Sequence, residues 1–175
     1  MDRFVKILRN KKRSILIVGI GSEFYGDDAV GIMIAEKLAN VSNGRLKVTV
    51  CGDSPERVAG MISQEQPDEL IFVDAVEFGG LPGDAAFFNS ADFASRFPQI
   101  STHKISLSLI ARMIESNGKT RVWLLGIQPE TLKPGSLLSA EVNKTAEIII
   151  RLIQSESSSG EKNSSSDSVN DYAYT

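Results

Sequence analysis

Four side chains that can hold a metal ion or move a proton occur at the predicted boundaries of secondary-structure elements. Asp27 and Asp28 follow a glycine-rich loop, Asp74 ends an apolar run, and His103 opens an amphipathic stretch. Two carboxylates and one imidazole form a usable ligand set for a divalent ion such as nickel, zinc or manganese. His103 is the only histidine in the sequence, so any such site must use it as its imidazole.

The loop at residues 19–28 has the spacing of a phosphate-binding loop but the wrong charges. A dinucleotide-binding fingerprint needs a third glycine three residues after Gly21, where this chain has Phe24. Gly21 and Gly26 have the Walker spacing, but two aspartates follow Gly26 where Lys and Ser or Thr are required. Adjacent acids suit a helix N-terminus but repel a phosphate. The loop therefore predicts a cation site, or carboxylates held near a reacting group.

Each of these residues also has an ordinary structural explanation. We expect Asp27 to be the N-cap of the following helix, which leaves Asp28 to point into a cleft. Asp74 could instead hydrogen-bond a neighbouring loop, although a carboxylate at a strand end in this kind of fold is more often functional. His103 could be an ordinary surface side chain. Its position beside two carboxylates favours the ligand interpretation.

Two further residues are weaker candidates. Cys51 follows a predicted strand and invites a Cys–His nucleophile interpretation. No oxyanion-type loop is recognisable beside it, so we interpret it as a small apolar core residue. Gln128 lies in the loop after the last strand, and we expect it to shape the wall of the cleft more than to act chemically.

The elements that must position these residues alternate between strand and helix. Apolar runs predict strands at residues 15–18, 46–50, 70–73, 84–88 and 121–125. Helical spacing and capping residues predict helices at residues 27–40, 54–64, 103–115 and 138–152. This order predicts an α/β fold, a three-layer αβα sandwich with a mostly parallel sheet of about five strands and helices on both faces. Residues 84–88 are its candidate antiparallel edge strand. Ligands of such folds bind outside the carboxyl ends of the strands, where the candidate residues fall.

Composition indicates an ordinary globular protein. The 175 residues are 42% hydrophobic and 23% charged, which favours one domain, here residues 14–154. The basic cluster within residues 1–13 is interpreted as a solvated N-terminal arm, and the Ser-rich residues 155–175 as a disordered tail. A net charge of −3 argues against nucleic acid as a partner. The sequence has no bilayer-spanning run or signal peptide and only one cysteine, so we expect no membrane partner and a cytoplasmic location.

Several motifs, in order, resemble those of the nickel-iron hydrogenase maturation proteases. These endopeptidases remove a C-terminal extension from the hydrogenase large subunit after nickel has been installed. The resemblance spans residues 15–152 and is closest to the subgroup that acts on formate-hydrogenlyase-type and related archaeal enzymes. Its motifs are Gly19-x-Gly21 with Gly26-Asp27-Asp28, Val73-Asp74-Ala75, Thr102-His103 and Gly126-Ile127-Gln128-Pro129-Glu130. It implies a phosphorylase/hydrolase-like fold and an aspartyl protease that activates its substrate enzyme.

The resemblance also implies roles for individual residues. Asp28, Asp74 and His103 would form the metal-binding triad. The nickel would be carried by the substrate, the hydrogenase large-subunit precursor, and other divalent ions could occupy the site. Asp28 or Asp74 would activate the attacking water, and the sequence leaves open which. The residues assigned to substrate binding are Gly21, Gly26, Asp27 and Gln128.

One departure from the family pattern and two alternatives remain. Many family members have Asp-Gly-Gly after the second strand, where this chain has Cys51-Gly52-Asp53. The chain could instead be a non-catalytic α/β metal-binding module. It could also be a metallopeptidase of the same fold that acts on another precursor.

Overall fold

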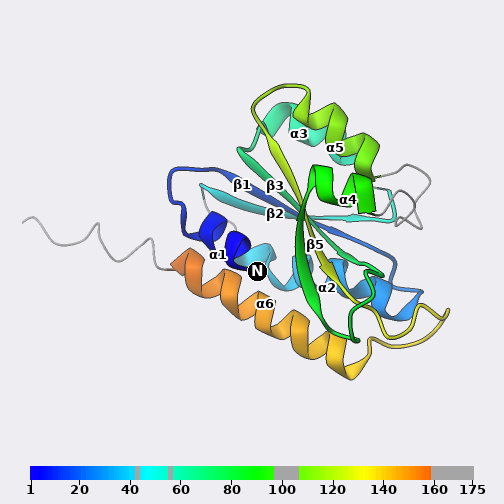
Figure 1. The fold of residues 1–175 in the computed structure, drawn as a ribbon. Helices are drawn as coiled ribbons and strands as arrows, with labels where there is room; N and C mark the ends of the chain where they lie inside the picture. Colours follow the sequence, from blue (N-terminus) through cyan, green and yellow to red (C-terminus); the bar gives the residue numbers. More distant parts are fainter. Residues whose placement is uncertain (42–43, 55–56, 97–106, 159–175) are drawn as a thin grey trace, which may run out of the picture.

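A five-stranded sheet in the order β2-β1-β3-β5-β4 forms the centre of the molecule (Figure 1). The computed structural model describes residues 1–41, 44–54, 57–96 and 107–158. The strands are β1 (Ile15–Ile20), β2 (Leu46–Gly52), β3 (Glu69–Ala75), β4 (Ala85–Asn89) and β5 (Arg121–Ile127). All pairings are parallel except that of β4 with β5. This confirms the mostly parallel sheet and its antiparallel edge strand.

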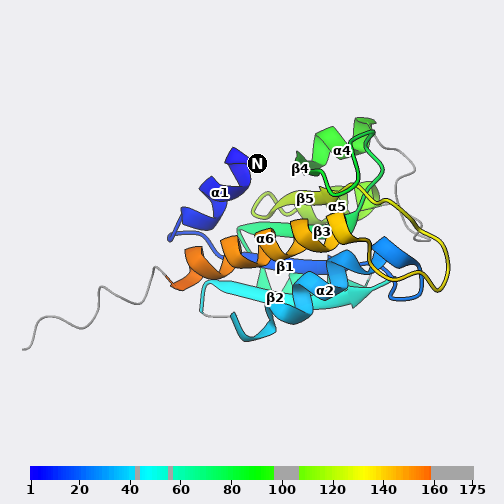
Figure 2. The same ribbon diagram turned by 90° about the horizontal axis from the view of Figure 1, so that it is seen from below.

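Helices cover both faces of the sheet, as the predicted three-layer sandwich requires (Figures 1 and 2). Helices α1, α2 and α6 lie on one face, and α3 and α5 lie on the other, with α4 beside α5. The α-helices are α1 (Asp2–Arg9), α2 (Val30–Lys37), α3 (Val58–Glu65), α4 (Ser90–Arg96), α5 (Leu107–Glu115) and α6 (Ala140–Ser158). Two short 3₁₀ helices are η1 (Gly26–Ala29) and η2 (Ala39–Val41). Within the described ranges, no helix is both long enough and apolar enough to cross a membrane.

The core is divided into two layers by the sheet. Strand β1 is buried along its whole length, as expected of a parallel strand that is covered on both sides. Its residues alternate: Ile15 and Ile17 pack with α1, α2 and α6, whereas Leu16 and Val18 pack with α3 and α5. An unbroken apolar run therefore produces a central strand here.

Four elements differ from the sequence-based expectations. Residues 2–9, expected in a solvated arm, form α1, which buries Phe4 in the core because its apolar residues share one face. The predicted helix 27–40 is divided into η1 and α2, and helix α4 was not predicted. Helix α6 extends to Ser158, so residues 155–158, expected in a disordered tail, are helical. Residues 101–106, which include the predicted start of the helix at 103, lie outside the described residues.

The order of connections places a topological switch point between β1 and β3. Strand β1 leads through α2 to β2 on one side, while β3 pairs with β1 on the other side. The helix that follows β1 and the helices that follow β3 cover opposite faces of the sheet. In open α/β sheets, ligands bind at such a switch point, outside the carboxyl ends of the strands. The residues at the ends of β1 and β3 are therefore the first place to look for a site.

Candidate active site at the carboxyl edge of the sheet

The glycines of the loop after β1 allow close backbone packing. Gly21 has a φ of +135°, and a Cβ there would lie 1.8 Å from the backbone oxygen of Asp28. A Cβ on Gly31 would lie 2.1 Å from the backbone oxygen of Val73 and 2.2 Å from that of Ile20. Only glycine fits where backbones approach so closely. Gly21 in the loop and Gly31 in α2 thus allow η1 and α2 to pack closely against β1 and β3.

This packing brings together two buried acids, Asp28 on η1 and Asp74 at the end of β3. Asp28 is 6% exposed and Asp74 is 2% exposed. Burial raises the pKa of the Asp74 carboxyl well above its usual value, and the negative charge of Asp28 raises that pKa further. A hydrogen bond with the backbone of Ala75 lowers it in part. The two acids therefore lie close enough for the charge of Asp28 to act on Asp74, and their repulsion would be relieved by a proton or by a cation. Their assignment as metal ligands stays a prediction.

Asp27 points away from this pair and holds a distant loop. Its Oδ2 accepts hydrogen bonds from the backbone N–H groups of Glu130 at 2.8 Å and Thr131 at 2.9 Å. Its Oδ1 accepts one from the backbone N–H of Ser139 at 2.6 Å. Neither η1 nor α2 has a side-chain N-cap hydrogen bond. The prediction that Asp27 caps the following helix is therefore wrong, because its carboxylate is committed to a loop more than a hundred residues away.

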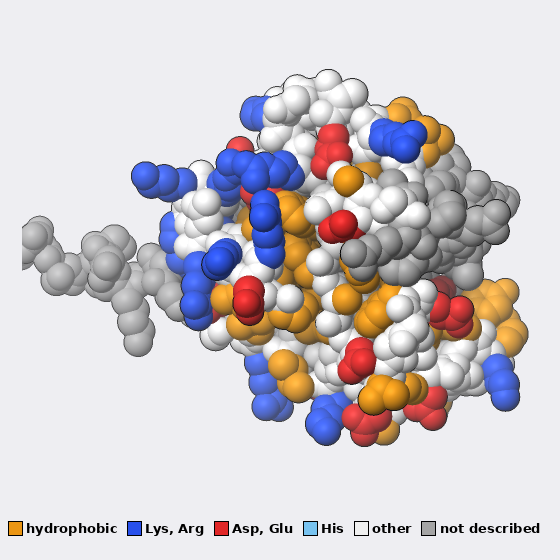
Figure 3. All heavy atoms as spheres, viewed as in Figure 1, with side chains coloured by type: hydrophobic (Ala, Val, Ile, Leu, Met, Phe, Trp, Pro, Cys, Tyr) orange, Lys and Arg blue, Asp and Glu red, His pale blue; other side chains and the backbone are white. Residues whose placement is uncertain are grey.

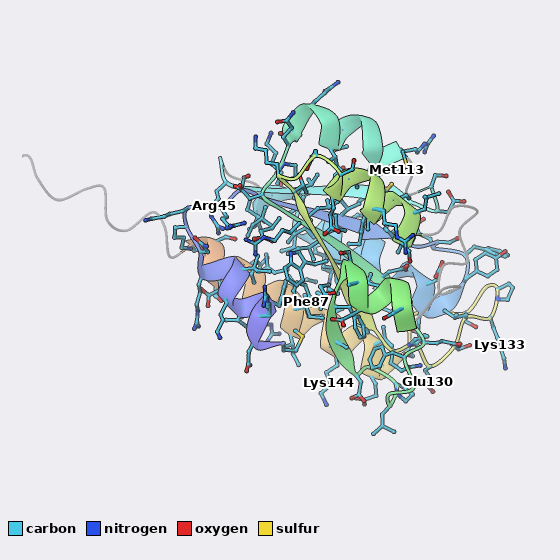
Figure 4. The ribbon with its side chains drawn as sticks, turned by 45° about the horizontal axis from the view of Figure 1, so that its top comes forward. Arg45, Phe87, Met113, Glu130, Lys133 and Lys144 are labelled. Carbon is cyan, nitrogen blue, oxygen red and sulfur yellow. The ribbon has the colours of Figure 1, made fainter. Side chains whose placement is uncertain are left out.

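The loop held by Asp27, residues 128–139, is called the exit loop below. It is also tied to the glycine loop by backbone bonds: Asp27 donates to the oxygen of Thr131 at 3.0 Å, and Gly135 donates to that of Phe24 at 2.8 Å. Glu130 and Lys133 of the exit loop lie at the end of the molecule opposite Arg45 (Figure 4). The two loops therefore form one connected rim at the carboxyl edge of the sheet.

Gln128 begins the exit loop and holds a second turn in place. Its Oε1 accepts hydrogen bonds from the backbone N–H groups of Phe78 at 2.9 Å, Gly79 at 3.1 Å and Gly80 at 3.1 Å. The side chain thus fixes the turn after β3. The expectation that Gln128 shapes the wall of a cleft stays a prediction. Its assignment to substrate binding, like those of Gly21, Gly26 and Asp27, stays a prediction.

Exposed apolar side chains lie on the same rim and were not singled out from the sequence. Phe24 is 60% exposed, and its ring meets that of Tyr25 edge to face, with centroids 5.2 Å apart. Leu137 on the exit loop is 89% exposed. Exposed apolar groups beside a cleft are typical of a binding surface. In the sequence, this surface could have been predicted from the adjacent aromatic residues Phe24 and Tyr25, because the rest of the loop is small or polar.

The two remaining candidates have different outcomes. Cys51 is buried among apolar side chains between the sheet and α3, and its thiol donates to the backbone oxygen of Ser54 at 3.0 Å. This environment agrees with a core cysteine. His103 lies outside the described residues, so its place beside the acids stays a prediction. Within the part of the chain that the structure describes, no three His, Cys, Asp or Glu side chains form a metal-binding group.

Comparisons with known proteins point to one family. A family model described as hydrogenase maturation protease matches residues 32–156. The hydrogenase 3 maturation protease of Escherichia coli is 34% identical over 116 residues, which are 66% of this chain and 72% of that protein. The crystal structure of a [NiFe] hydrogenase maturation protease, HycI from Thermococcus kodakarensis, superposes with a TM-score of 0.79 and 29% identity. That match covers 89% of this chain and 99% of the other.

A further solved structure agrees with this assignment. The solution structure of the endopeptidase HycI from Escherichia coli is similar with a TM-score of 0.71 and 25% identity. It covers 81% of this chain and 90% of that one. The sequence match, the shared fold and the acid pair at the switch point all agree with the resemblance drawn from the motifs. The chain belongs to the hydrogenase maturation protease family.

Proposed function

We propose that this protein is the endopeptidase that removes the C-terminal extension from the nickel-loaded precursor of a nickel-iron hydrogenase large subunit. The observation that carries this proposal is the buried pair Asp28 and Asp74 at the sheet's switch point, in a member of a maturation protease family. The two carboxylates lie where ligands of α/β folds bind, and burial places them in surroundings that disfavour two negative charges.

The donor chemistry suits recognition of a metal carried by the substrate. Carboxylate oxygens bind a divalent ion without the thiolates that would compete with the substrate's own sulfur ligands. A cation beside the pair would also relieve the repulsion between Asp28 and Asp74. We assign His103 as the third ligand, on the resemblance of its motif. The nickel belongs to the substrate in this proposal, and the protease's residues test whether it is present.

In the chemical step, Asp28 or Asp74 acts as the general base. The carboxylate takes a proton from water as the water oxygen bonds to the scissile carbonyl carbon. The C–N bond then breaks, and the same carboxyl returns the proton to the leaving amine nitrogen. This division of roles makes the enzyme an aspartyl-type protease that depends on a metal in its substrate. Because the chain has a single cysteine, it forms no internal disulfide, which suits the cytoplasm as its compartment.

In this proposal, the rim formed by the glycine loop and the exit loop positions the substrate. Asp27 and Gln128 fix the backbone of this rim through their hydrogen bonds. Phe24 on the glycine loop and Leu137 on the exit loop present exposed apolar surface. We therefore expect the precursor to dock on these exposed apolar groups, while the buried carboxylates reach the metal and the peptide bond.

Variants of the three assigned ligands test the proposal. Asp28→Asn, Asp74→Asn and His103→Ala should each abolish cleavage of the nickel-loaded precursor in a mass-spectrometric assay, with circular dichroism unchanged. Asp92→Asn on α4 removes a carboxylate away from the site and should cleave at the wild-type rate. Normal cleavage by Asp28→Asn and His103→Ala would overturn the ligand assignment. Nickel binding without any cleavage by the wild type would instead support a non-catalytic metal-binding module.

A further inference from the structure

A second concave region lies at the opposite edge of the sheet from the acid pair. It is a cleft of about 500 Å³ between α1 and the first residues of β3 and β5. We call it the amino-edge cleft, and its walls include Arg3, Lys6, Arg13, Glu69, Arg121 and Trp123. A volume of this size falls within the range of binding pockets. Since Glu69 and Arg121 begin their strands, this cleft is separated from the candidate active site by the length of the sheet.

The floor of the cleft is a fixed set of contacts around Glu69. This buried carboxylate accepts a hydrogen bond from Trp123 Nε1 at 2.6 Å and forms an ion pair with Arg13 at 2.9 Å. Two groups contact the indole of Trp123. Phe87 stacks on it with centroids 5.2 Å apart, and the guanidinium of Arg3 lies 5.0 Å from its centroid. Such preorganised contacts are expected of a binding site more than of a loose surface patch.

The cleft carries an excess of positive charge in a protein whose net charge is −3. Its lining contains four cationic side chains and two carboxylates. The charge of Glu69 is balanced by Arg13, so the exposed cations Arg3, Lys6 and Arg121 outnumber the remaining carboxylate, Asp2. Figure 3 shows Lys and Arg side chains gathered on the same face, around α1. A concave surface of one sign attracts ligands of the other.

We propose that the amino-edge cleft docks an acidic segment of a partner protein. The guanidinium groups of Arg3 and Arg121 have the planar donor geometry that pairs with carboxylates. Nucleic acid fits less well, because Trp123 is only 5% exposed and its faces are covered by Phe87 and Arg3, so it offers no surface on which a base could stack. The inference is independent of the proteolytic function.

Trp123 allows a direct test, because it is the only tryptophan in the chain and lies in the cleft itself. The full-length protein is titrated with a short peptide of alternating glutamate and glycine, and with the same peptide carrying glutamine for glutamate. Tryptophan fluorescence and the anisotropy of a peptide label report binding. The glutamate peptide should give a saturable change that weakens as salt is added, and the glutamine peptide should give none.

Charge-reversal variants locate the binding. Lys6→Glu and Arg121→Glu should each weaken binding of the glutamate peptide by about tenfold, which corresponds to the loss of one close charge pair. Lys144→Glu makes the same change of net charge at the start of α6, outside the cleft lining, and should change the affinity by less than about twofold. Thermal unfolding confirms that each variant is folded.

Three results would overturn the proposal. The first is the absence of saturable binding by the glutamate peptide. The second is an equal loss of affinity in Lys144→Glu, which would show attraction to the whole surface instead of the cleft. The third is tighter binding of a single-stranded oligonucleotide or of inorganic polyphosphate than of the peptide, which would assign the cleft to phosphate ligands. None of these results bears on cleavage of the precursor, so the two proposals fail separately.

Discussion

Asp27 and Asp28 are adjacent in the sequence but have opposite surroundings. The two carboxylate oxygens of Asp27 accept hydrogen bonds from three backbone N–H groups of the exit loop. Asp28 instead faces Asp74, whose pKa it raises. The turn of a 3₁₀ helix separates two neighbouring side chains by about a third of a turn, which is enough to direct them into different environments. Asp27 therefore stabilises the rim, and Asp28 belongs to the proposed site.

Replacing Asp27 by Asn distinguishes this role from that of a helix cap. Asn is as good an N-cap as Asp, so a capping role predicts almost no loss of stability. If Asp27 instead anchors the exit loop, the Asn side chain would place its amide N–H₂ group against a backbone N–H donor. We then expect a loss of about 2 kcal/mol or more in the free energy of unfolding. Urea unfolding measures this loss. Asp92→Asn, the control, should stay within about 0.5 kcal/mol of the wild type.

Replacing Asp74 by Asn should stabilise the protein at neutral pH in the absence of substrate. The pKa of Asp74 is raised in the folded state, chiefly by burial, so the folded protein retains a proton that the unfolded chain has released. The contribution of the Asp74 carboxyl to the free energy of unfolding is fully present below its unfolded pKa, and it is lost as the pH rises through its folded pKa. The advantage of the Asn variant should therefore shrink as the pH falls from the raised folded pKa toward the unfolded value of about 3.9, and it should vanish below that value. A variant less stable than the wild type at neutral pH would contradict the buried-charge account.

At the scale of elements, the approach of α2 to the sheet is what brings the acids together. A substitution at Gly31 tests it, because Ala normally favours a helix by about 1 kcal/mol over Gly. Here a Cβ would lie 2.1 Å from the backbone of β3, and we expect Gly31→Ala to lower the free energy of unfolding by about 3 kcal/mol. Gly60→Ala in α3 has open space and should be neutral or stabilising. Equal unfolding midpoints for the two variants would show that the close packing is unimportant.

Elements that depend on local pattern were predictable, and those that depend on distant contacts were less so. The unbroken apolar runs of β1 and β3 predicted central strands, and the position of Asp74 at the end of one of them predicted that it would meet the glycine loop. Helix α1 was missed because its short apolar face is interrupted by the charges that suggested an arm. The role of Asp27 was missed because its three donors are more than a hundred residues away.

At the scale of the whole molecule, the sheet separates two regions of different chemistry. Its carboxyl edge carries buried acids beneath an apolar rim, and its amino edge carries a cleft rich in Arg and Lys. The rim and acids suit a protein substrate that brings a cation with it. The amino-edge cleft lies outside that contact, so a partner could occupy it while cleavage takes place.

The central claim is that the buried acid pair acts only when the substrate supplies the metal. The most direct measurement compares nickel-loaded and nickel-free large-subunit precursor, each incubated with the full-length protein and analysed by intact-mass spectrometry. We expect a single C-terminal peptide to be lost from the loaded precursor, and the mass of the nickel-free precursor to stay unchanged. Equal cleavage of both precursors, or no cleavage at any nickel loading, would contradict the account.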